Sequence, residues 1–570
     1  MSRVTNGPVA DQRRFLFFVI LASIVLSLPP LFSGFMADDY FFTGGAITPD
    51  APFGYYNFTE QNIASEIQQW WTSPNFKVRF FRPLSSLALY VDFTLLKGNA
   101  LLAHLHSMVW FVLLLIGAHR VYRSLLSEKT AKWATALFSV SVIHAWNAGW
   151  IASRHTVMGG ALTVFAAYWY IQWRHHGRRM HGILSATLFV LGLMTSEVSL
   201  SFLGIVVSYE MLFSKHPISN RLAASWWVAA VAFIYLIFYI AMGYGAAGSD
   251  LYTSPLSQPA MFCRLFVPKL LGLAGALVLG VPASFRVVPG LEAISLGAGS
   301  IGLMLLTTGV AMSWKRLDGD EKRAVKGLSL MAFCTLFPAV AGIAMGREFA
   351  LTGMAVIGVI ALVLKTLFTV KGPLRHRAPS LATAIVLFIG VGVITPLSRI
   401  GMGLLVVQQS TISKRIGESD TGCPAGAHAM VFTGGVDLPI AYGPHFVATH
   451  QGKFFKSWHQ MVLTTDAVTI ARPSSDRLVL SAKGTLATTL LLREKDNPLA
   501  VGDVIERRFM TIEVLETGND GPTKIQVTFK SPRGVADICA LKTEDGVLKS
   551  FPLPDVGTSV TVPYTPSDFS

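Results

Sequence analysis

The sequence predicts an α-helical polytopic membrane protein that ends in a β-rich domain on the outer side of the membrane. Of its 570 residues, 52% are hydrophobic and only 14% are charged, whereas soluble globular domains carry about 25% charged residues. Apolar runs of about 20 residues, the length that spans the hydrocarbon layer as a helix, recur along the chain. They stop near residue 410, where short alternating or β-branched segments replace them.

The first apolar run, residues 15–35, has no charged residue. It is longer than the apolar region of a typical signal peptide, and no clean small-residue cleavage site follows it. We therefore expect a retained signal anchor, kinked or ended near Pro29 and Pro30. Comparable runs lie at residues 101–118, 226–242, 328–345 and 381–398.

The net charge of +14 comes from basic residues that cluster beside the apolar runs. The positive-inside rule places such clusters in the cytoplasm. The basic composition is therefore an orientation signal, and no nucleic-acid partner is predicted. The clusters contain Arg13 and Arg14; Arg120, Arg123 and Lys129; Arg174, Arg178 and Arg179; Lys315, Arg316, Lys322, Arg323 and Lys326; and Lys371, Arg375 and Arg377.

These signals predict about 11 spans and a C-terminus on the outer side. Two apolar stretches, residues 265–281 and 296–313, precede the cluster at Lys315. If both crossed, the last two basic clusters would lie outside, so we expect only one to cross fully. The other would be re-entrant or lie along the interface. The domains are thus a membrane domain of residues 1–409, with a first outer loop at 36–82, and an outer domain of residues 410–570.

The outer domain is predicted to be β-rich, with strands near residues 487–492, 509–515 and 524–529. The sequence GNDG at 518–521 is a good hairpin turn between the last two. Cys423 and Cys539 lie in this domain. An oxidising compartment would permit a disulfide between them, and two free thiols are an equal alternative. The sequence shows no repeats and no convincing metal-ligand spacing.

Ionisable residues gather near the predicted outer ends of the spans. Placing a charged side chain near the bilayer costs free energy, so each of them is expected to have a structural or functional role. A carboxylate can take a proton from a nucleophile, and arginines can bind a phosphate through two hydrogen bonds. Taken singly, these residues could be solvated helix ends, snorkelling or packing residues, or an Arg154–Glu197 ion pair. Their shared depth favours a site. They are Asp38, Asp39, Arg79, Arg82, His104, His106, Arg154, His155, Glu197 and Arg347.

Several of these residues stand in motifs that resemble a known enzyme superfamily. The segment 35–40, FMADDY, resembles the acidic pair that opens the first outer loop of GT-C glycosyltransferases, polytopic enzymes that use polyprenyl-phosphate-linked sugars. Residues 81–87, FRPLSSL, and 98–106, GNALLAHLH, resemble the arginine-proline-leucine and histidine region of the transmembrane-and-TPR O-mannosyltransferases and their bacterial relatives.

Later motifs follow in the same order but depart from the family in places. Residues 150–155, WIASRH, are similar to a tryptophan-isoleucine-x-x-arginine-acid segment, with His155 replacing the acid. Residues 195–197, TSE, are similar to serine-lysine-glutamate without the lysine. Arg347 falls where the family has a late outer-loop arginine. The resemblance covers about residues 12–370, and no TPR repeats follow it.

The resemblance implies transfer of a sugar from a polyprenyl-phosphate donor to a lipid, glycan or protein acceptor, with inversion. Asp38 would be the base, and Asp39 would support it or bind a divalent cation (Mg²⁺ or Mn²⁺). The donor phosphate would be held by arginines, while histidines and Glu197 would position the substrates. The implied substrate-binding residues are Arg79, Arg82, Arg154, Arg347, His104, His106, His155 and Glu197. Short spans and compact loops favour a bacterial inner membrane with a periplasmic active face.

Three other functions remain open from the sequence. A secondary transporter would place ionisable residues near the midplane and often show two similar halves. A lipid-linked polysaccharide polymerase or ligase would be expected to carry its main motifs in one large late outer loop. A non-catalytic scaffold would only present the outer domain.

Overall fold

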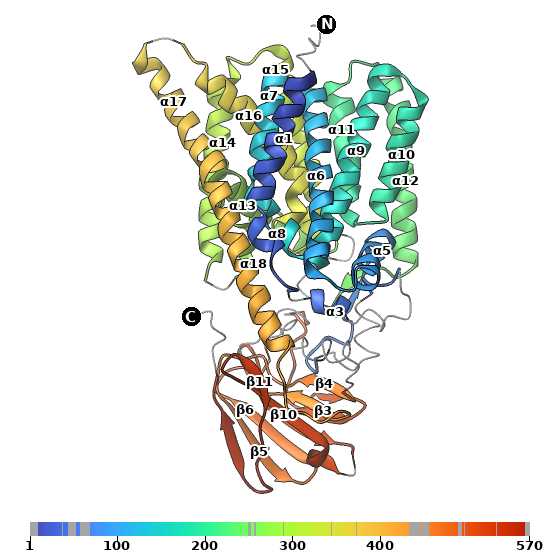
Figure 1. The fold of residues 1–570 in the computed structure, drawn as a ribbon, viewed down its shortest axis with the longest axis vertical. Coiled ribbons are helices and arrows are strands. Elements are labelled where there is room, and N and C mark those ends of the chain that lie inside the picture. The colour runs from blue at the N-terminus through green and yellow to red at the C-terminus, as the bar shows by residue number, and fades with distance from the viewer. Residues whose placement is uncertain are drawn as a thin grey trace.

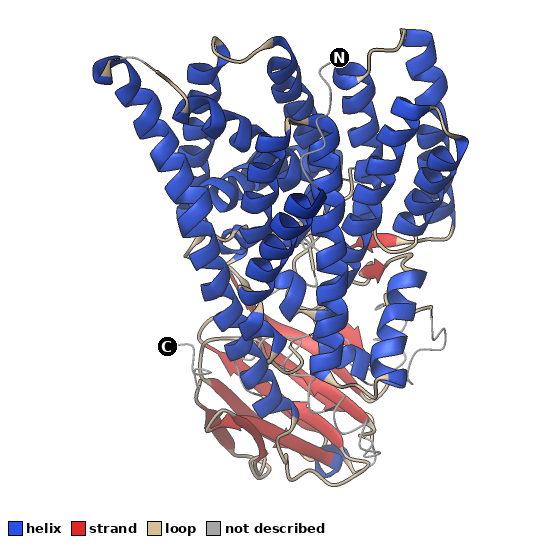
Figure 2. Ribbon diagram, turned by 45° about the horizontal axis from the view of Figure 1, so that its top comes forward, coloured by secondary structure: helices blue, strands red, loops and turns tan. Residues whose placement is uncertain are grey.

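The computed structural model shows a helical bundle with a β domain beyond one end of it (Figures 1 and 2). The N-terminal helix begins at the opposite end of the bundle from the β domain (Figure 1). The structure describes residues 9–36, 38–43, 53–57, 69–248, 252–255, 258–288, 290–343, 345–371, 373–432, 445, 455–487, 493–494, 496–531 and 533–564.

Long helices make up the bundle, and short helices connect them at its outer end. The helices of the bundle are α1 (Val9–Val25), α6 (Ala100–Leu125), α7 (Glu128–Val140), α9 (Arg154–His176), α10 (Arg179–Leu193), α11 (Ser201–Ser208, continued by the π-helical turn Tyr209–Phe213), α12 (Ile218–Ala241), α13 (Pro259–Leu279), α14 (Glu292–Trp314), α15 (Gly319–Ala341), α16 (Ala350–Phe368), α17 (Leu374–Ile389) and α18 (Thr395–Gly417). The short helices are α2 (Leu28–Leu31), α3 (Asp39–Thr43), α5 (Pro83–Tyr90) and α8 (Ala145–Gly149).

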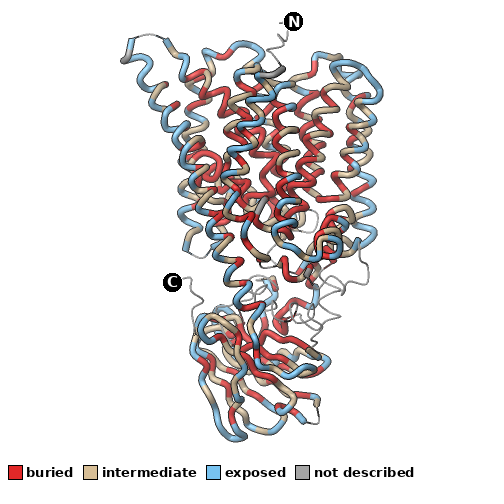
Figure 3. Tube along the Cα trace, in the orientation of Figure 1, coloured by how far each residue is buried: buried red, intermediate tan, exposed pale blue. Residues whose placement is uncertain are grey.

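Within the described ranges, 7 helices are long and apolar enough to cross a membrane, so the protein is a multi-pass membrane protein. They are α6, α12, α13, α14, α15, α16 and the continuous helix Arg375–Gly417 formed by α17 and α18. Helices α1, α7, α9, α10 and α11 are shorter or less apolar and pack between them. The described helices that are long and apolar enough to cross a membrane are thus fewer than the about 11 predicted spans. Helix α16 is buried along most of its length, at the centre of the bundle (Figure 3).

Consecutive membrane spans normally run in opposite directions, but helix α13 runs parallel to the next helix, α14. Gly272 of α13 faces Ser295 of α14, and Gly275 faces Gly299. Residue numbers rise together along this contact, so the two helices run in the same direction. The chain must therefore turn back between them, through the 3-10 turn Ala283–Val287. Of the two ambiguous stretches, only the one in α14 crosses, and α13 is re-entrant.

The described residues of the outer domain form two sheets. One has the strand order β11-β10-β3-β4 and the other β12-β5-β6-β9-β8-β7. The strands are β3 (His428–Val431), β4 (Ser457–Gln460), β5 (Val468–Ser474), β6 (Arg477–Ala482), β7 (Val504–Glu506), β8 (Met510–Gly518), β9 (Gly521–Phe529), β10 (Ile538–Glu544), β11 (Val547–Ser550) and β12 (Ser559–Val562). The predicted hairpin is confirmed, because Gly518 pairs with Gly521 across the β8–β9 turn. Of the predicted strand at 487–492, residues 488–492 lie outside the described residues.

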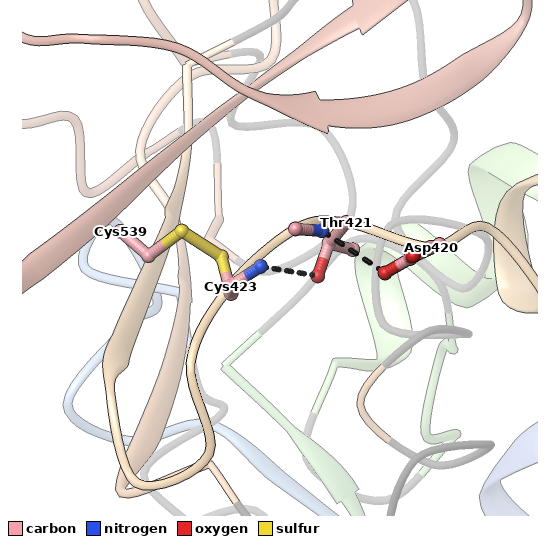
Figure 4. The surroundings of a disulfide bond; sticks show 5 residues. Asp420, Thr421, Cys423 and Cys539 are labelled. Atoms are coloured by element: carbon pink, nitrogen blue, oxygen red, sulfur yellow. Dashed lines mark hydrogen bonds between the residues drawn. A yellow bond between two sulfur atoms is a disulfide. The ribbon is translucent and has the colours of Figure 1, made fainter.

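A disulfide joins Cys423 to Cys539, with their Cα atoms 5.7 Å apart (Figure 4). Cys423 lies in the turn that leaves α18, where its amide donates to Thr421 Oγ1 at 3.3 Å. Cys539 lies in β10. The bond thus ties the end of the last membrane helix to the four-stranded sheet. Disulfides persist in oxidising compartments, which agrees with an outer position for this domain.

The first outer loop is anchored in the β domain. The rings of Trp70 and Trp71 are buried in the core of that domain, together with Met461 and Ile512. Trp70 Nε1 donates to the carbonyl oxygen of Met461 at 2.9 Å, and Arg493 Nε donates to the carbonyl oxygen of Trp71 at 2.9 Å. The loop that carries the predicted base therefore has its far side embedded in the outer domain.

A buried arginine in α18 holds three helices together. Arg399 donates to Ser23 and Ser27 at the end of α1 and to the carbonyl oxygen of Ser139 in α7. Its guanidinium also lies over the ring of Phe111, 5.0 Å from the centroid. A charged residue inside a span is a functional candidate by default. Here serine and carbonyl oxygens satisfy the group, so it acts as a structural clamp.

Candidate functional site

The outer end of the bundle brings the first outer loop against the turn that precedes α9. Asp39, the first residue of α3, is fully buried there. Its Oδ1 accepts a hydrogen bond from the amide of Ala152 at 2.7 Å, and its Oδ2 accepts from the amide of Met36 at 3.0 Å. Burial raises the pKa of Asp39 to about 8, against the lowering effect of these amides. Asp39 therefore fixes the loop to the α9 turn.

Asp38, one residue earlier, is partly exposed and differs from Asp39 in its surroundings. Burial raises the pKa of its carboxyl above the ordinary value, while the charge of Arg347 and the side chain of Trp150 oppose that rise. A carboxylate with a raised pKa is a stronger base, and partial exposure lets another molecule reach it. Asp38 thus has the properties of a proton acceptor, next to a cation from a distant part of the chain.

That cation lies on a tight turn between α15 and α16. Gly346 has a φ of 105°, which L-residues rarely adopt, and this bend turns the chain into the 3-10 turn Arg347–Phe349. Lys269 of α13 donates to the carbonyl oxygen of Gly342 at 2.5 Å and also to that of Val340. These bonds hold the end of α15, so the position of the turn is fixed from the neighbouring re-entrant helix.

Arg347 itself is buried, with only 8% of its surface exposed. Its guanidinium lies over the ring of Trp150, 4.0 Å from the centroid, and its Nε lies 3.1 Å from Glu348 Oε1. Its Nη1 is buried and has no hydrogen-bond partner among the described residues. An unsatisfied buried donor costs about 1–3 kcal/mol, and more when it is charged. A bound anion would satisfy this donor.

Arg82 lies at the start of α5 and is bound to Glu197. Its Nε and Nη2 donate to Glu197 Oε2 at 2.9 and 2.7 Å. The other oxygen, Oε1, accepts from the hydroxyl of Tyr239 in α12 at 3.0 Å. The guanidinium also lies 4.0 Å from the ring centroid of Phe80. This pair connects three segments at the outer end of the bundle.

The side chain of Tyr252 shows that these groups share one neighbourhood. It is partly buried, and its ring packs edge-on against Phe80, with the centroids 5.3 Å apart. Burial raises the pKa of its hydroxyl, and four nearby charges act on it. The charges belong to Arg82, Arg347, Asp38 and Glu348. Three of the predicted site residues, from three separate turns, therefore act electrostatically on one tyrosine.

Arg154 belongs to a separate, deeper centre. It is 1% exposed and forms an ion pair with Asp92, which is fully buried in the π-helical turn Val91–Leu95. Its Nε donates to Ser107 Oγ at 2.9 Å and its Nη2 to the carbonyl oxygen of Ala103 at 2.7 Å. Its guanidinium donors are therefore taken up by groups of the protein itself. The suggested Arg154–Glu197 ion pair is wrong, because Glu197 pairs with Arg82 and Arg154 with Asp92.

The remaining predicted residues lie around these two centres. His106 Nδ1 is 2.9 Å from Asp92 Oδ1, in the Arg154 centre, whereas His104 turns the other way, towards Gly34 and Ser33. His155 packs edge-on against Tyr56, with ring centroids 5.4 Å apart. Arg79 lies on β1 (Lys77–Arg79), which pairs with β2 (Gly245–Ala247), and donates to the carbonyl oxygen of Met242 at 3.2 Å.

Sequence reasoning missed Asp92, Lys269 and Tyr252, and it noted Trp150 only as the first residue of the segment 150–155. Asp92 is a lone carboxylate in the apolar stretch SLALYVDFTLL, and Lys269 is a lone cation in a predicted span. Such charges are expected to have a buried partner, so both left a signal. Tyr252 left none, because its importance comes from segments that fold next to it.

The described residues do not supply a fitting ligand set for Mg²⁺ or Mn²⁺. Such ions take oxygen ligands from carboxylates and waters. Both oxygens of Asp39 accept backbone amides, and no group of three or more His, Cys, Asp or Glu side chains that could hold a metal lies together in the described ranges.

The sequence matches no family model and no curated protein. Among solved structures, the chain is similar to the archaeal oligosaccharyltransferase AglB from Archaeoglobus fulgidus, in complex with an inhibitory peptide and a dolichol-phosphate. The identity is 12% over 78% of this chain and 64% of that one, with a TM-score of 0.43. It is also similar to the arabinofuranosyltransferase AftD from Mycobacteria, at 13% identity over 74% of this chain and 30% of that one, with a TM-score of 0.39. The chain thus spans less than two thirds of the length of either.

Proposed function

We propose that the protein is a membrane glycosyltransferase that uses a polyprenyl-phosphate-linked sugar at the outer face of the membrane. One observation carries the proposal. A partly exposed carboxylate with a raised pKa, Asp38, is acted on by the charge of Arg347, whose buried Nη1 has no partner among the described residues. A base and an unsatisfied anion-binding group at one site are what transfer from a phosphate-linked donor requires.

In the proposed reaction, Asp38 takes the proton of an acceptor hydroxyl as its oxygen attacks the anomeric carbon of the sugar. The bond between that carbon and the phosphate oxygen breaks, and polyprenyl phosphate leaves with the electron pair. Arg347 stabilises the negative charge that develops on the phosphate. One displacement inverts the configuration at the anomeric carbon. The acceptor is a lipid, a glycan or a protein.

The other outer-end residues have supporting roles in this proposal. Arg82 and Glu197 form a rigid pair that lines the neighbourhood of Tyr252, and Asp39 fixes the loop that carries Asp38. His155 and Arg79 belong to the same shell of positioning residues. Arg154, His104 and His106 stabilise the fold around the site, since they are bound to other groups of the protein.

The basic clusters and the Cys423–Cys539 disulfide support an inner-membrane protein with its site and β domain on the periplasmic side. A secondary transporter is less well supported, because Arg399, the buried cation of α18, is bound to serines and a carbonyl oxygen.

The test is glycan and lipid profiling of a strain that lacks the protein, complemented with wild-type or Asp38→Asn protein. We expect one envelope sugar to disappear in the deletion strain, to return with wild type and to stay absent with Asp38→Asn. Asp520→Asn, an exposed aspartate in the β8–β9 turn, is the matched control and should restore the sugar. Full restoration by Asp38→Asn, at equal amounts in the membrane, would exclude the mechanism.

A further inference from the structure

A cavity of about 450 Å³ opens at the other end of the bundle, away from the site described above. It lies where the π-helical turn Tyr209–Phe213, at the end of α11, meets the beginnings of α12 and α15. These segments belong to the end of the bundle from which α1 starts (Figure 1). The positive-inside rule assigns this end to the cytoplasm.

The lining of the cavity is strongly cationic. Five of its nine lining residues carry a positive charge, and none of the nine carries a carboxylate. The five are Lys215, Arg221, Lys322, Arg323 and Lys326. Like charges so close together repel one another, and within a cavity the repulsion is screened less than on an open surface. An anion is the natural complement.

Local partners neutralise little of this charge. Arg221 donates to the carbonyl oxygens of His216 and Glu210, which fixes its guanidinium in the wall but adds no negative charge. Arg323 pairs with the exposed Asp320 at 3.2 Å. Over the described part of the chain, Lys215 and Lys322 have no ion pair.

The nearest buried carboxylate is occupied elsewhere. Glu210 Oε1 accepts from Arg174 Nε at 2.6 Å and from the hydroxyl of Tyr170 at 2.8 Å. Glu321 is bound to Lys365 at 2.5 Å. These acids therefore leave the positive excess of the cavity in place.

The surroundings of the cavity favour a lipid over a soluble anion. Met211 lines the cavity and is 61% exposed, and Ile218 and Leu222, on the first turns of α12, are 72% and 65% exposed. Apolar side chains this exposed on a membrane helix contact acyl chains. A ligand with a phosphate beside an acyl chain would satisfy both surfaces at once.

We propose that this cavity binds the phosphate-bearing headgroup of an anionic phospholipid of the cytoplasmic leaflet. Orientation signals need no cavity, so the positive-inside rule does not by itself account for the arrangement. The bound headgroup would bridge α12 and α15. The proposal is independent of the sugar-transfer chemistry at the opposite end.

The test uses the full-length protein purified in a neutral detergent. Phosphatidylglycerol and phosphatidylcholine with the same acyl chains are added, and bound lipid is measured by native mass spectrometry. We expect selective retention of phosphatidylglycerol. The triple variant Lys215→Gln, Lys322→Gln, Lys326→Gln should weaken that binding by about 10- to 100-fold, since each Lys near the surface contributes on the order of 1 kcal/mol.

The matched control is the triple variant Lys371→Gln, Arg375→Gln, Arg377→Gln, which removes equal charge from exposed positions at the loop before α17 and in its first turn. It should bind as wild type does. If the cavity triple variant does not fold, Lys322→Gln alone should weaken binding about 3- to 5-fold. Equal loss in both triple variants would show general electrostatic attraction and overturn the proposal.

A soluble ligand is distinguished by a second arm with inorganic phosphate. Millimolar phosphate should not displace phosphatidylglycerol. Displacement, or retention of phosphatidylcholine at the same level, would overturn the assignment to an anionic lipid.

Discussion

Two arginine centres lie close together at the outer end of the bundle, and they differ in how fully their charges are satisfied. Arg154 has Asp92, Ser107 and the carbonyl oxygen of Ala103 as partners, and it is sealed from solvent. Arg347 has Glu348 beside it, but its buried Nη1 has no hydrogen-bond partner among the described residues.

This difference distinguishes a charged residue that stabilises the fold, Arg154, from one that is free to bind a ligand, Arg347. Both arginines are buried and both follow outer turns, so the sequence makes them look alike. A fully bonded buried ion pair holds a fold in register, and breaking it costs about 3–5 kcal/mol. A buried donor left without a partner is a cost to the fold that a bound anion can remove. The predictions below test this division.

The largest expected effect is on Asp38. Asp38→Asn removes the proposed base, and the rate of sugar transfer should fall by about 10²–10⁴-fold. Transfer from a synthetic polyprenyl-phosphate sugar by the reconstituted protein measures it. The thermal unfolding temperature should match that of wild type and of Asp520→Asn, so a variant that unfolds early would point to a structural role for Asp38.

The next effect is on the stability of the Arg154 centre. Arg154→Gln leaves the fully buried Asp92 without its cation, which should cost about 3–5 kcal/mol of folding stability. Thermal unfolding in detergent, followed by tryptophan fluorescence, measures it. The double variant Arg154→Gln, Asp92→Asn should be less destabilised than the single one. Wild-type stability of Arg154→Gln would contradict its place as a structural centre.

Arg347→Gln should have the opposite profile. The rate of transfer should fall by about 10²–10³-fold, as for other groups that stabilise a developing anion. The unfolding temperature should fall less than that of Arg154→Gln, because Glu348 is the one ion-pair partner of Arg347 among the described residues. If the two variants lost transfer rate and folding stability to the same extent, the division into a catalytic and a structural arginine would be wrong.

The same comparison predicts a shift in pH dependence. Burial raises the pKa of Asp38 and the charge of Arg347 lowers it. The base acts when deprotonated, so the rate should rise with pH through a pKa above that of an exposed aspartate, about 3.9. Arg347→Gln removes the lowering charge, so its residual activity should rise at higher pH than in wild type. A shift to lower pH would show that the two groups do not interact.

The smallest expected effect comes from removing divalent cations. Both oxygens of Asp39 already accept backbone amides, so we propose that EDTA leaves the rate of transfer unchanged. Atomic absorption of the purified protein checks for bound metal. Loss of activity in EDTA, restored by Mg²⁺ or Mn²⁺, would assign Asp39 a role that its two amide bonds argue against.

Much of the architecture was predictable because it depends on the partition of apolar segments into the bilayer and on basic residues at the ends of the membrane helices. The apolar runs predicted the bundle, and the basic clusters led to the expectation that one of two stretches, now α13 and α14, would not cross. The turn at 518–521 predicted the β8–β9 hairpin. Each of these rests on local sequence.

The pairing of charges was not predictable, because it depends on which turns meet. Nothing near Glu197 in the sequence distinguishes Arg82 from Arg154 as its partner, since both lie far away along the chain. The place of Tyr252 near the site depends on its packing against Phe80, which the sequence does not reveal. The sequence therefore indicates which residues need partners, and the fold decides which partners they receive.

The burial of Trp70 and Trp71 in the β domain has a consequence for biosynthesis. Trp70 and its partner Met461 are 391 residues apart. At roughly 5–20 residues per second, ribosomes need on the order of 20–80 s to make that stretch. In the proposed orientation, the loop crosses the membrane during this time, before the domain that covers its two tryptophans has been made. The first outer loop would then be among the first parts of the chain to be exported and among the last to reach its final packing.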